Sequence, residues 1–246
     1  MDKPMGTDPM DSRISTARRM QPEERGGGAD HFAAPLGSAT SGRLLFTNGA
    51  HRVAVRAHSD VPGLYRARFG DRMPTMVGVR GGLVIIRYPR APYCDWLNCR
   101  SERPAEVALN AGILWDIEVR GGASRLVADL RGLCLGSLNV YGGASRLEVV
   151  LSAPTGTVPV VIRGGASNVA IRRPNEVAAR LRVDGGATNL KFDDRRIGAA
   201  GGELDLGNRG YNGATDRYDI TITGGANNVS IDKQRGIRGR SSGASV

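Results

Sequence analysis

The sequence predicts an all-β protein, and more specifically a parallel β-solenoid: a single-stranded β-helix with about 21 residues per rung. Three observations lead to this prediction. A Gly-Gly-Ala unit recurs at a nearly fixed interval, apolar and polar residues alternate on both sides of it, and 35 of the 246 residues are glycine while aromatic residues make up 5%. Collagen would need glycine at every third position, and a disordered chain would lack apolar runs. We therefore interpret the glycines as corners of a folded structure.

Five copies of the Gly-Gly-Ala unit begin at residues 121, 142, 164, 185 and 224, so the successive offsets are 21, 22, 21 and 39 residues. The last offset fits two turns of the same period. In a solenoid each strand pairs with its equivalent one turn later, so that identical side chains stack in columns. Glycine tolerates positive φ at a tight corner. The predicted structural corners are Gly121, Gly122, Gly142, Gly143, Gly164, Gly165, Gly185, Gly186, Gly224 and Gly225.

Period-2 alternation flanks each glycine pair and predicts one strand on either side. Around the second pair, for example, Leu138 and Val140 precede the corner and Leu147 and Val149 follow it, all expected to face inward. Short polar side chains come directly after each alanine and predict a ladder beside the corner: Ser124, Ser145, Ser167, Thr188 and Asn227. A β-sandwich built from the same strands is the alternative fold.

Composition divides the chain into four segments. Residues 1–41 have no strand or helix periodicity, and we expect a disordered N-terminal arm. Residues 42–112 keep the repeat with lower fidelity and predict an irregular β region with a capping insertion around Trp96. Residues 113–232 form the regular solenoid, and residues 233–246 form a basic flexible tail.

The chain is basic, with 34 Lys and Arg against 24 Asp and Glu and a formal net charge of +10. This balance permits contact with nucleic acid or an acidic surface. The densest basic segment gives a candidate anion-binding patch: Arg163, Arg172, Arg173, Arg180, Arg182, Lys191, Arg195 and Arg196. A solvated face with partial ion pairing is the alternative interpretation of the same residues.

The sequence nominates no catalytic residue, metal site or cofactor. It contains no Gly-x-Ser-x-Gly unit and no phosphate-binding loop, and its three histidines are scattered. Cys94 and Cys99 could close a small disulfide loop or remain reduced, and the sequence leaves both open. No apolar run has the length of a membrane helix, and the first residues lack a secretory h-region, so we expect a cytoplasmic protein.

The Gly-Gly-Ala-Ser-x-Leu units of residues 113–232 resemble the single-stranded β-helix domains of bacterial adhesin heads and of envelope-stress-protein tails. More distantly, the rung pattern is similar to that of bactofilins. The resemblance implies a β-helix of unknown function and carries over no catalytic residues.

The leading functional hypothesis is therefore a non-enzymatic scaffold that binds a protein partner or itself. Stacked strands leave unpaired edges at each end, and the end near Ile231 is expected to be open for end-to-end assembly. The alternative is a binding module for an anionic polymer, either nucleic acid or polysaccharide. A polysaccharide-active enzyme comes third, because Asp129, Asp193 and Asp232 occupy equivalent outward positions, although not on adjacent rungs.

Overall fold

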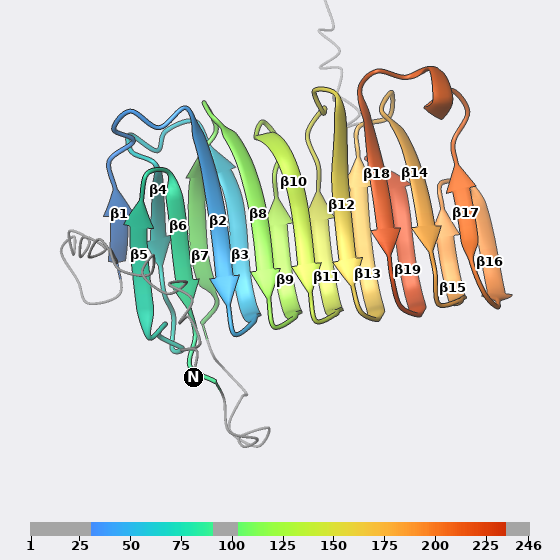
Figure 1. Ribbon diagram of the computed structural model, residues 1–246, viewed down its shortest axis with the longest axis horizontal. Helices are drawn as coiled ribbons and strands as arrows, with labels where there is room; N and C mark the ends of the chain where they lie inside the picture. The colour runs from blue at the N-terminus through green and yellow to red at the C-terminus, as the bar shows by residue number, and fades with distance from the viewer. Residues whose placement is uncertain (1–30, 91–102, 235–246) are drawn as a thin grey trace, which may run out of the picture.

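The computed structural model describes residues 31–90 and 103–234. These residues form an all-β structure, as predicted, and the one helical element among them is a 3₁₀ turn, η1 (Tyr211–Gly213). Two mixed sheets, of nine and ten strands, lie face to face along the whole molecule (Figure 1). The apolar core lies between the two sheets.

Neighbouring strands in each sheet are often distant in the chain. In spatial order, the nine-stranded sheet contains β17 (Leu204–Gly207), β14 (Ala178–Val183), β18 (Arg217–Ile222), β12 (Thr157–Arg163), β10 (Cys134–Tyr141), β8 (Leu114–Arg120), β2 (Ser41–Thr47), β6 (Leu83–Arg87) and β5 (Met76–Arg80). In spatial order, the ten-stranded sheet contains β1 (His31–Ala34), β4 (Tyr65–Arg68), β7 (Ala105–Asn110), β3 (Ala50–His58), β9 (Ala123–Asp129), β11 (Ala144–Val150), β13 (Ala166–Arg173), β19 (Ala226–Lys233), β15 (Ala187–Phe192) and β16 (Arg195–Ala200).

The alternating residues face the core as their period predicts. Leu138 and Val140 on β10 and Leu147 and Val149 on β11 are all at most 1% exposed. Trp115 is fully buried on β8, and its indole Nε1 donates a hydrogen bond to the carbonyl oxygen of Asn110 at 2.8 Å. Burial of one face of each strand therefore supplies the main stabilisation of the fold.

Tight corners join the two sheets. Six strands of the nine-stranded sheet, β2, β8, β10, β12, β14 and β18, each lead through a short corner into a strand of the ten-stranded sheet. These corners lie along the lower edge of the molecule in Figure 1. Neighbouring units pair in parallel, so that Ala144 lies between Ala123 and Ala166. The alanines therefore form the column expected from the repeat.

The order of the units in space differs from their order in the chain. The strand β13 does not pair with β15, because β19 lies between them and pairs in parallel with both. In the other sheet β18 lies in the same way between β12 and β14. The 39-residue offset is therefore not two further turns. The chain leaves β15, forms β16 and β17, passes η1 and returns to insert its last unit inside the stack.

Antiparallel strands cover both ends of the stack. At one end β16 pairs with β15 and β17 pairs with β14; at the other β4 pairs with β7 and β5 with β6. The prediction of an open end near Ile231 is wrong, because this residue is fully buried on β19, an interior strand. The chain's own hairpins occupy edges that we expected to be free.

Two predicted segment boundaries can be compared with the described residues. His31–Ala34, within the expected disordered arm, forms β1 and pairs with β4. Gln234, within the expected flexible tail, donates its side-chain amide to the carbonyl oxygen of Leu151 at 2.7 Å. Residues 35–41 of the expected arm are also described, and Ser41 begins β2; Lys233 of the expected tail ends β19. Residues 1–30 and 235–246, and most of the predicted capping insertion with Cys94, Trp96 and Cys99, lie outside the described residues.

Candidate functional site

The predicted basic patch is distributed over several parts of the molecule. Arg172 and Lys191 lie on strands of the ten-stranded sheet, whereas Arg180 and Arg182 lie on β14 of the other sheet. Arg163 ends β12 beside a corner, Arg195 and Arg196 begin the edge strand β16, and Arg173 is fully buried. Residues that are close in the sequence therefore do not form one continuous cationic surface.

Most of these cations also have partners. Arg180 forms an ion pair with Asp205, whose pKa it lowers through a hydrogen bond, and the Arg182 Nε lies 3.6 Å from the same carboxylate. Lys191 contacts Asp232 at 2.6 Å. Outside these pairs, Arg163 lies over the ring of Tyr141, and Arg195 donates to the carbonyl oxygen of Gly207. The solvated, ion-paired alternative describes this segment better than a dedicated site.

Arg173 is an interior residue. Its Nη2 donates to the Oδ2 of Asp193 at 2.5 Å, and its side chain has no exposed surface. The Nε and Nη1 of Arg173 and the Oδ1 of Asp193 are buried without a hydrogen-bond partner in the described structure. The pair joins the end of β13 to the turn after β15, across the inserted strand β19.

The three aspartates singled out for a polysaccharide-active enzyme are also engaged. Asp129 contacts Arg131 at 2.5 Å, Asp193 contacts Arg173 and Asp232 contacts Lys191. The expectation that none lie on adjacent rungs is wrong for one pair, because the insertion of β19 brings the β15 end, with Asp193, next to the β19 end, with Asp232. All three carboxylates thus neutralise basic side chains.

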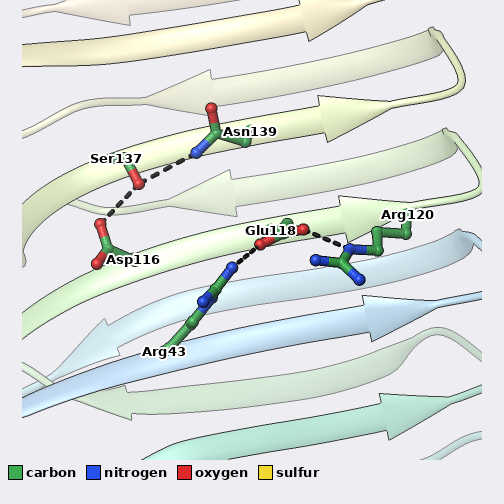
Figure 2. Close-up of polar contacts among 6 residues, drawn as sticks. All are labelled: Arg43, Asp116, Glu118, Arg120, Ser137 and Asn139. Carbon is green, nitrogen blue, oxygen red and sulfur yellow. Dashed lines mark hydrogen bonds and ion pairs between the residues drawn. The ribbon is translucent and has the colours of Figure 1, made fainter. Parts of the chain in front are cut away.

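A polar network covers part of the outer face of the nine-stranded sheet (Figure 2). Glu118 on β8 is only 5% exposed and accepts hydrogen bonds from Arg43 on β2 and from Arg120. Burial opposes ionisation of Glu118, but the two guanidinium groups outweigh it and lower its pKa below the ordinary value. A second chain of hydrogen bonds in the same view links Asp116, Ser137 and Asn139.

A groove runs along the corner edge of the molecule, and we call it the corner groove. It is lined by corner glycines, by the alanines that follow them, and by His51, Ser124 and Ser145. The part of the groove beside β3, β9 and β11 has a volume of about 460 Å³ and is also lined by Arg72 and Tyr88. A second part begins at Gly165 and continues toward β15.

The residue after the polar ladder forms a further column that the sequence analysis missed. All six members have positive φ, between 49° and 55°: Arg52, Arg125, Arg146, Asn168, Asn228 and Asn189 in spatial order. The signal was present in the repeat, since two of the units read Gly-Gly-Ala-Ser-Arg-Leu. The column begins with three guanidinium groups and continues with three amides. We call Arg52, Arg125 and Arg146 the arginine column.

No metal-binding cluster of three or more His, Cys, Asp or Glu side chains occurs in residues 31–90 and 103–234. Among the same residues, no helix is long and apolar enough to cross a membrane.

Comparison with known proteins yields two matches. Residues 81–172 match the family model of the N-terminal domain of toast_rack, DUF2154. A crystal structure from Clostridium sporogenes, described as a "putative cell adhesion protein", is 17% identical and superposes with a TM-score of 0.66. The match covers 83% of this chain and 98% of that one, and it shows a shared fold. No curated protein matches the sequence. The distant similarity to bactofilins stays a prediction.

Proposed function

We propose that the chain is a non-enzymatic interaction module built on a β-solenoid, and that it binds its partners along the side of the stack. The observation that carries the proposal is the pairing of equivalent residues in successive units, such as Ala123, Ala144 and Ala166. Parallel pairing of repeated units favours a solenoid over a sandwich of hairpins, in which neighbouring strands run antiparallel. Such a stack presents columns of like side chains on a rigid surface.

The structure of the end formed by β16 and β17 supports binding along the side over end-to-end assembly. At this end the edge strand of the ten-stranded sheet is β16, which begins with Arg195 and Arg196, both exposed. Charged side chains on an edge strand disfavour pairing with another copy. At the same end the edge strand of the nine-stranded sheet is the four-residue strand β17. A short edge strand offers few free backbone groups to a second molecule.

The proposal that the chain binds partners without catalysing a reaction is supported by the ion pairs that its carboxylates form. Glycoside hydrolysis needs two carboxyl groups with separate acid and base roles. Asp232 on β19 and Asp193, in the turn directly after the adjacent strand β15, each form an ion pair with a basic side chain. The similarity in fold to a "putative cell adhesion protein" also agrees with an interaction role. The cytoplasmic location stays a prediction from the sequence.

One set of measurements separates the three functional classes. The full chain is studied by sedimentation velocity over a hundredfold range of concentration and is then incubated with acidic and neutral polysaccharides. We expect a species of constant size and no change in the length of any polysaccharide. Growth of mass with concentration would favour end-to-end assembly, and new chain ends in the polysaccharide would show an enzyme. Either outcome would overturn the proposal.

A further inference from the structure

We propose that the arginine column and the adjoining corner groove bind an acidic polysaccharide, whose carboxylate or sulfate groups contact the arginines. The inference rests on the proposed function and assigns it a ligand and a place on the stack.

The arginines lie on adjacent strands of the ten-stranded sheet. The residues that flank Arg125 and Arg146 pair directly, Ser124 with Ser145 and Leu126 with Leu147. Adjacent strands are about 4.8 Å apart, so these two side chains start from neighbouring points on the surface. Arg52 extends the column by one strand, since the residues flanking it pair with Ser124 and Leu126 in the same way.

Contacts further along the same column show that side chains at this position reach one another. Asn189 Nδ2 donates to Asn228 Oδ1 at 2.9 Å, and Asn228 Nδ2 donates to Asn168 Oδ1 at 2.6 Å. Arginines cannot satisfy each other in this manner, because a guanidinium group has donors only. Arg125 and Arg146 form no ion pair with any residue that the structure describes, so their donors are available to an anion.

The backbone makes arginine an unfavourable choice here. A left-handed conformation strains most side chains, whereas asparagine adopts it readily. The three other units have asparagine at this position, but φ is 55° at Arg125 and 54° at Arg146. Strained residues that persist in a fold cluster at functional sites. The two arginines are therefore more consistent with binding than with stability.

The corner groove supplies neutral hydrogen-bonding groups beside this charge. Ser124 and Ser145 line it, and the hydroxyl groups of both can donate and accept. Tyr88 also lines the groove, is 3% exposed, and has a hydroxyl without a hydrogen-bond partner in the described structure. Arg72 lies over the Tyr88 ring with its guanidinium carbon 5.8 Å from the ring centre. Burial raises the pKa of Tyr88 to about 12, so its hydroxyl keeps its proton at neutral pH.

This combination of groups favours a polysaccharide over a nucleic acid. Proteins that bind single-stranded nucleic acids stack the bases on exposed aromatic rings. Tyr88 is the one aromatic residue among those lining this part of the groove, and it is buried. Sugar hydroxyls match the serines, and the acidic groups match the arginines through charge-assisted hydrogen bonds.

The test measures binding of the full chain to four labelled probes by fluorescence anisotropy. Three are oligosaccharides of equal length: an oligogalacturonate, which carries carboxylates, a heparin-derived oligosaccharide, which carries sulfates, and a neutral dextran oligosaccharide. The fourth is a single-stranded DNA of the same charge as the oligogalacturonate. We expect binding to one or both acidic probes, weakened by salt, and none to dextran. Preference between the two acidic probes identifies the anionic group.

The site is tested with the double variant Arg125→Asn and Arg146→Asn, which copies the residue found in the other units. It should fold as well as the native chain and bind the acidic probe at least about tenfold more weakly, the effect expected for loss of one charged hydrogen bond. The matched control is Arg196→Asn with Arg209→Asn, which removes the same charge from two exposed positions elsewhere. This control should change the affinity less than about twofold.

Several outcomes would overturn the inference: native affinity in the Arg125→Asn and Arg146→Asn variant, an equal loss in the control, or tighter binding to single-stranded DNA of the same charge. Absence of binding to both acidic probes would also overturn the inference, but it would not contradict the proposed function as a non-enzymatic interaction module. Shortening of a bound probe would instead overturn the proposed function.

Discussion

The corner glycines are required for two different reasons, which single alanine substitutions can separate. At Gly142, φ is 101° and an added Cβ would lie 2.9 Å from the backbone nitrogen of Gly122. At Gly224, φ lies outside the left-handed region, but the Cβ would lie 2.7 Å from the carbonyl carbon of Gly164. At Gly225, φ is again unstrained and the nearest atom is 3.6 Å away. Positive φ, which glycine tolerates at a tight corner, thus occurs at Gly142 and not at the last pair.

These contacts give a ranked set of stability changes. Overpacking against rigid backbone costs about 1–3 kcal/mol, which is the loss we expect for Gly224→Ala. Gly142→Ala adds the strain of a left-handed alanine, about 1–2 kcal/mol, for a total of about 2–5 kcal/mol. Gly225→Ala places the new methyl group in ordinary contact and reduces the freedom of the unfolded chain. Its stability should be unchanged or raised by up to about 1 kcal/mol.

Thermal unfolding followed by circular dichroism checks the ranking. For a chain of this size, 1 kcal/mol shifts the melting temperature by about 2–4 °C. Gly142→Ala should then melt about 4–20 °C below the native chain, Gly224→Ala about 2–12 °C below it, and Gly225→Ala no lower than the native chain. An equal loss in Gly224→Ala and Gly225→Ala would refute the reasoning, because the two differ in the space available to the methyl group.

Three further predictions concern the interior and the order of the units. Asp193→Asn should lower the free energy of unfolding by about 3–5 kcal/mol, because it leaves Arg173 buried without its counter-charge. Adding Arg173→Met to this variant should restore part of the lost stability. Denaturant titration of the single and double variants checks both expectations. The pKa of Glu118 is lower in the folded chain than its ordinary value of 4.5, so its ion pairs contribute fully to stability above that pH. This contribution is lost as the pH falls through the lowered pKa. Glu118→Gln should therefore reduce the loss of stability in acid, and an unchanged dependence of the free energy of unfolding on pH between 3 and 6 would contradict the prediction. Removal of residues 217–246 takes the interior strand β18 from one sheet and the interior strand β19 from the other. Size-exclusion chromatography and circular dichroism should then show a loss of the cooperative fold. A soluble, shortened stack would instead show that β12 and β14 can pair with each other.

The strands were predictable because their signal is local. The alternation of Leu147 and Val149 with polar residues indicates which face of the strand is buried, and it can be recognised without knowing which other strands pair with it. The order of the strands was not predictable for the same reason. All corner units carry nearly the same residues, so β13 can pair equally well with the unit that follows it in the chain or with the last one. Repetition specifies how two units stack and leaves open which two units do so.

The residues of the predicted basic patch are dispersed because closeness along the chain is not closeness in space. The segment of residues 163–196 contributes strands to both sheets, and successive side chains of a strand point to opposite faces. Arg172 therefore lies outside, whereas Arg173 lies in the core. The arginine column draws on residues 52, 125 and 146, too far apart for a window of local charge to detect. A comparison of equivalent positions across the repeats does detect it, because stacked units convert a sequence period into a spatial column.

The inserted units change how the two ends of the stack are held. In a simple repeat array the terminal unit contacts only its neighbour in the sequence and can detach without disturbing the rest. In this chain β3 lies between β7 and β9, and β19 lies between β13 and β15, so near each end an interior strand comes from a distant part of the chain. Opening either end separates a strand from an inserted strand, β15 from β19 or β7 from β3, which couples the antiparallel caps to the regular middle. Such non-local pairing slows folding, because loops must close before their contacts form. It also protects the strand edges on which unwanted association would begin, and the side of the stack remains as the surface available to partners.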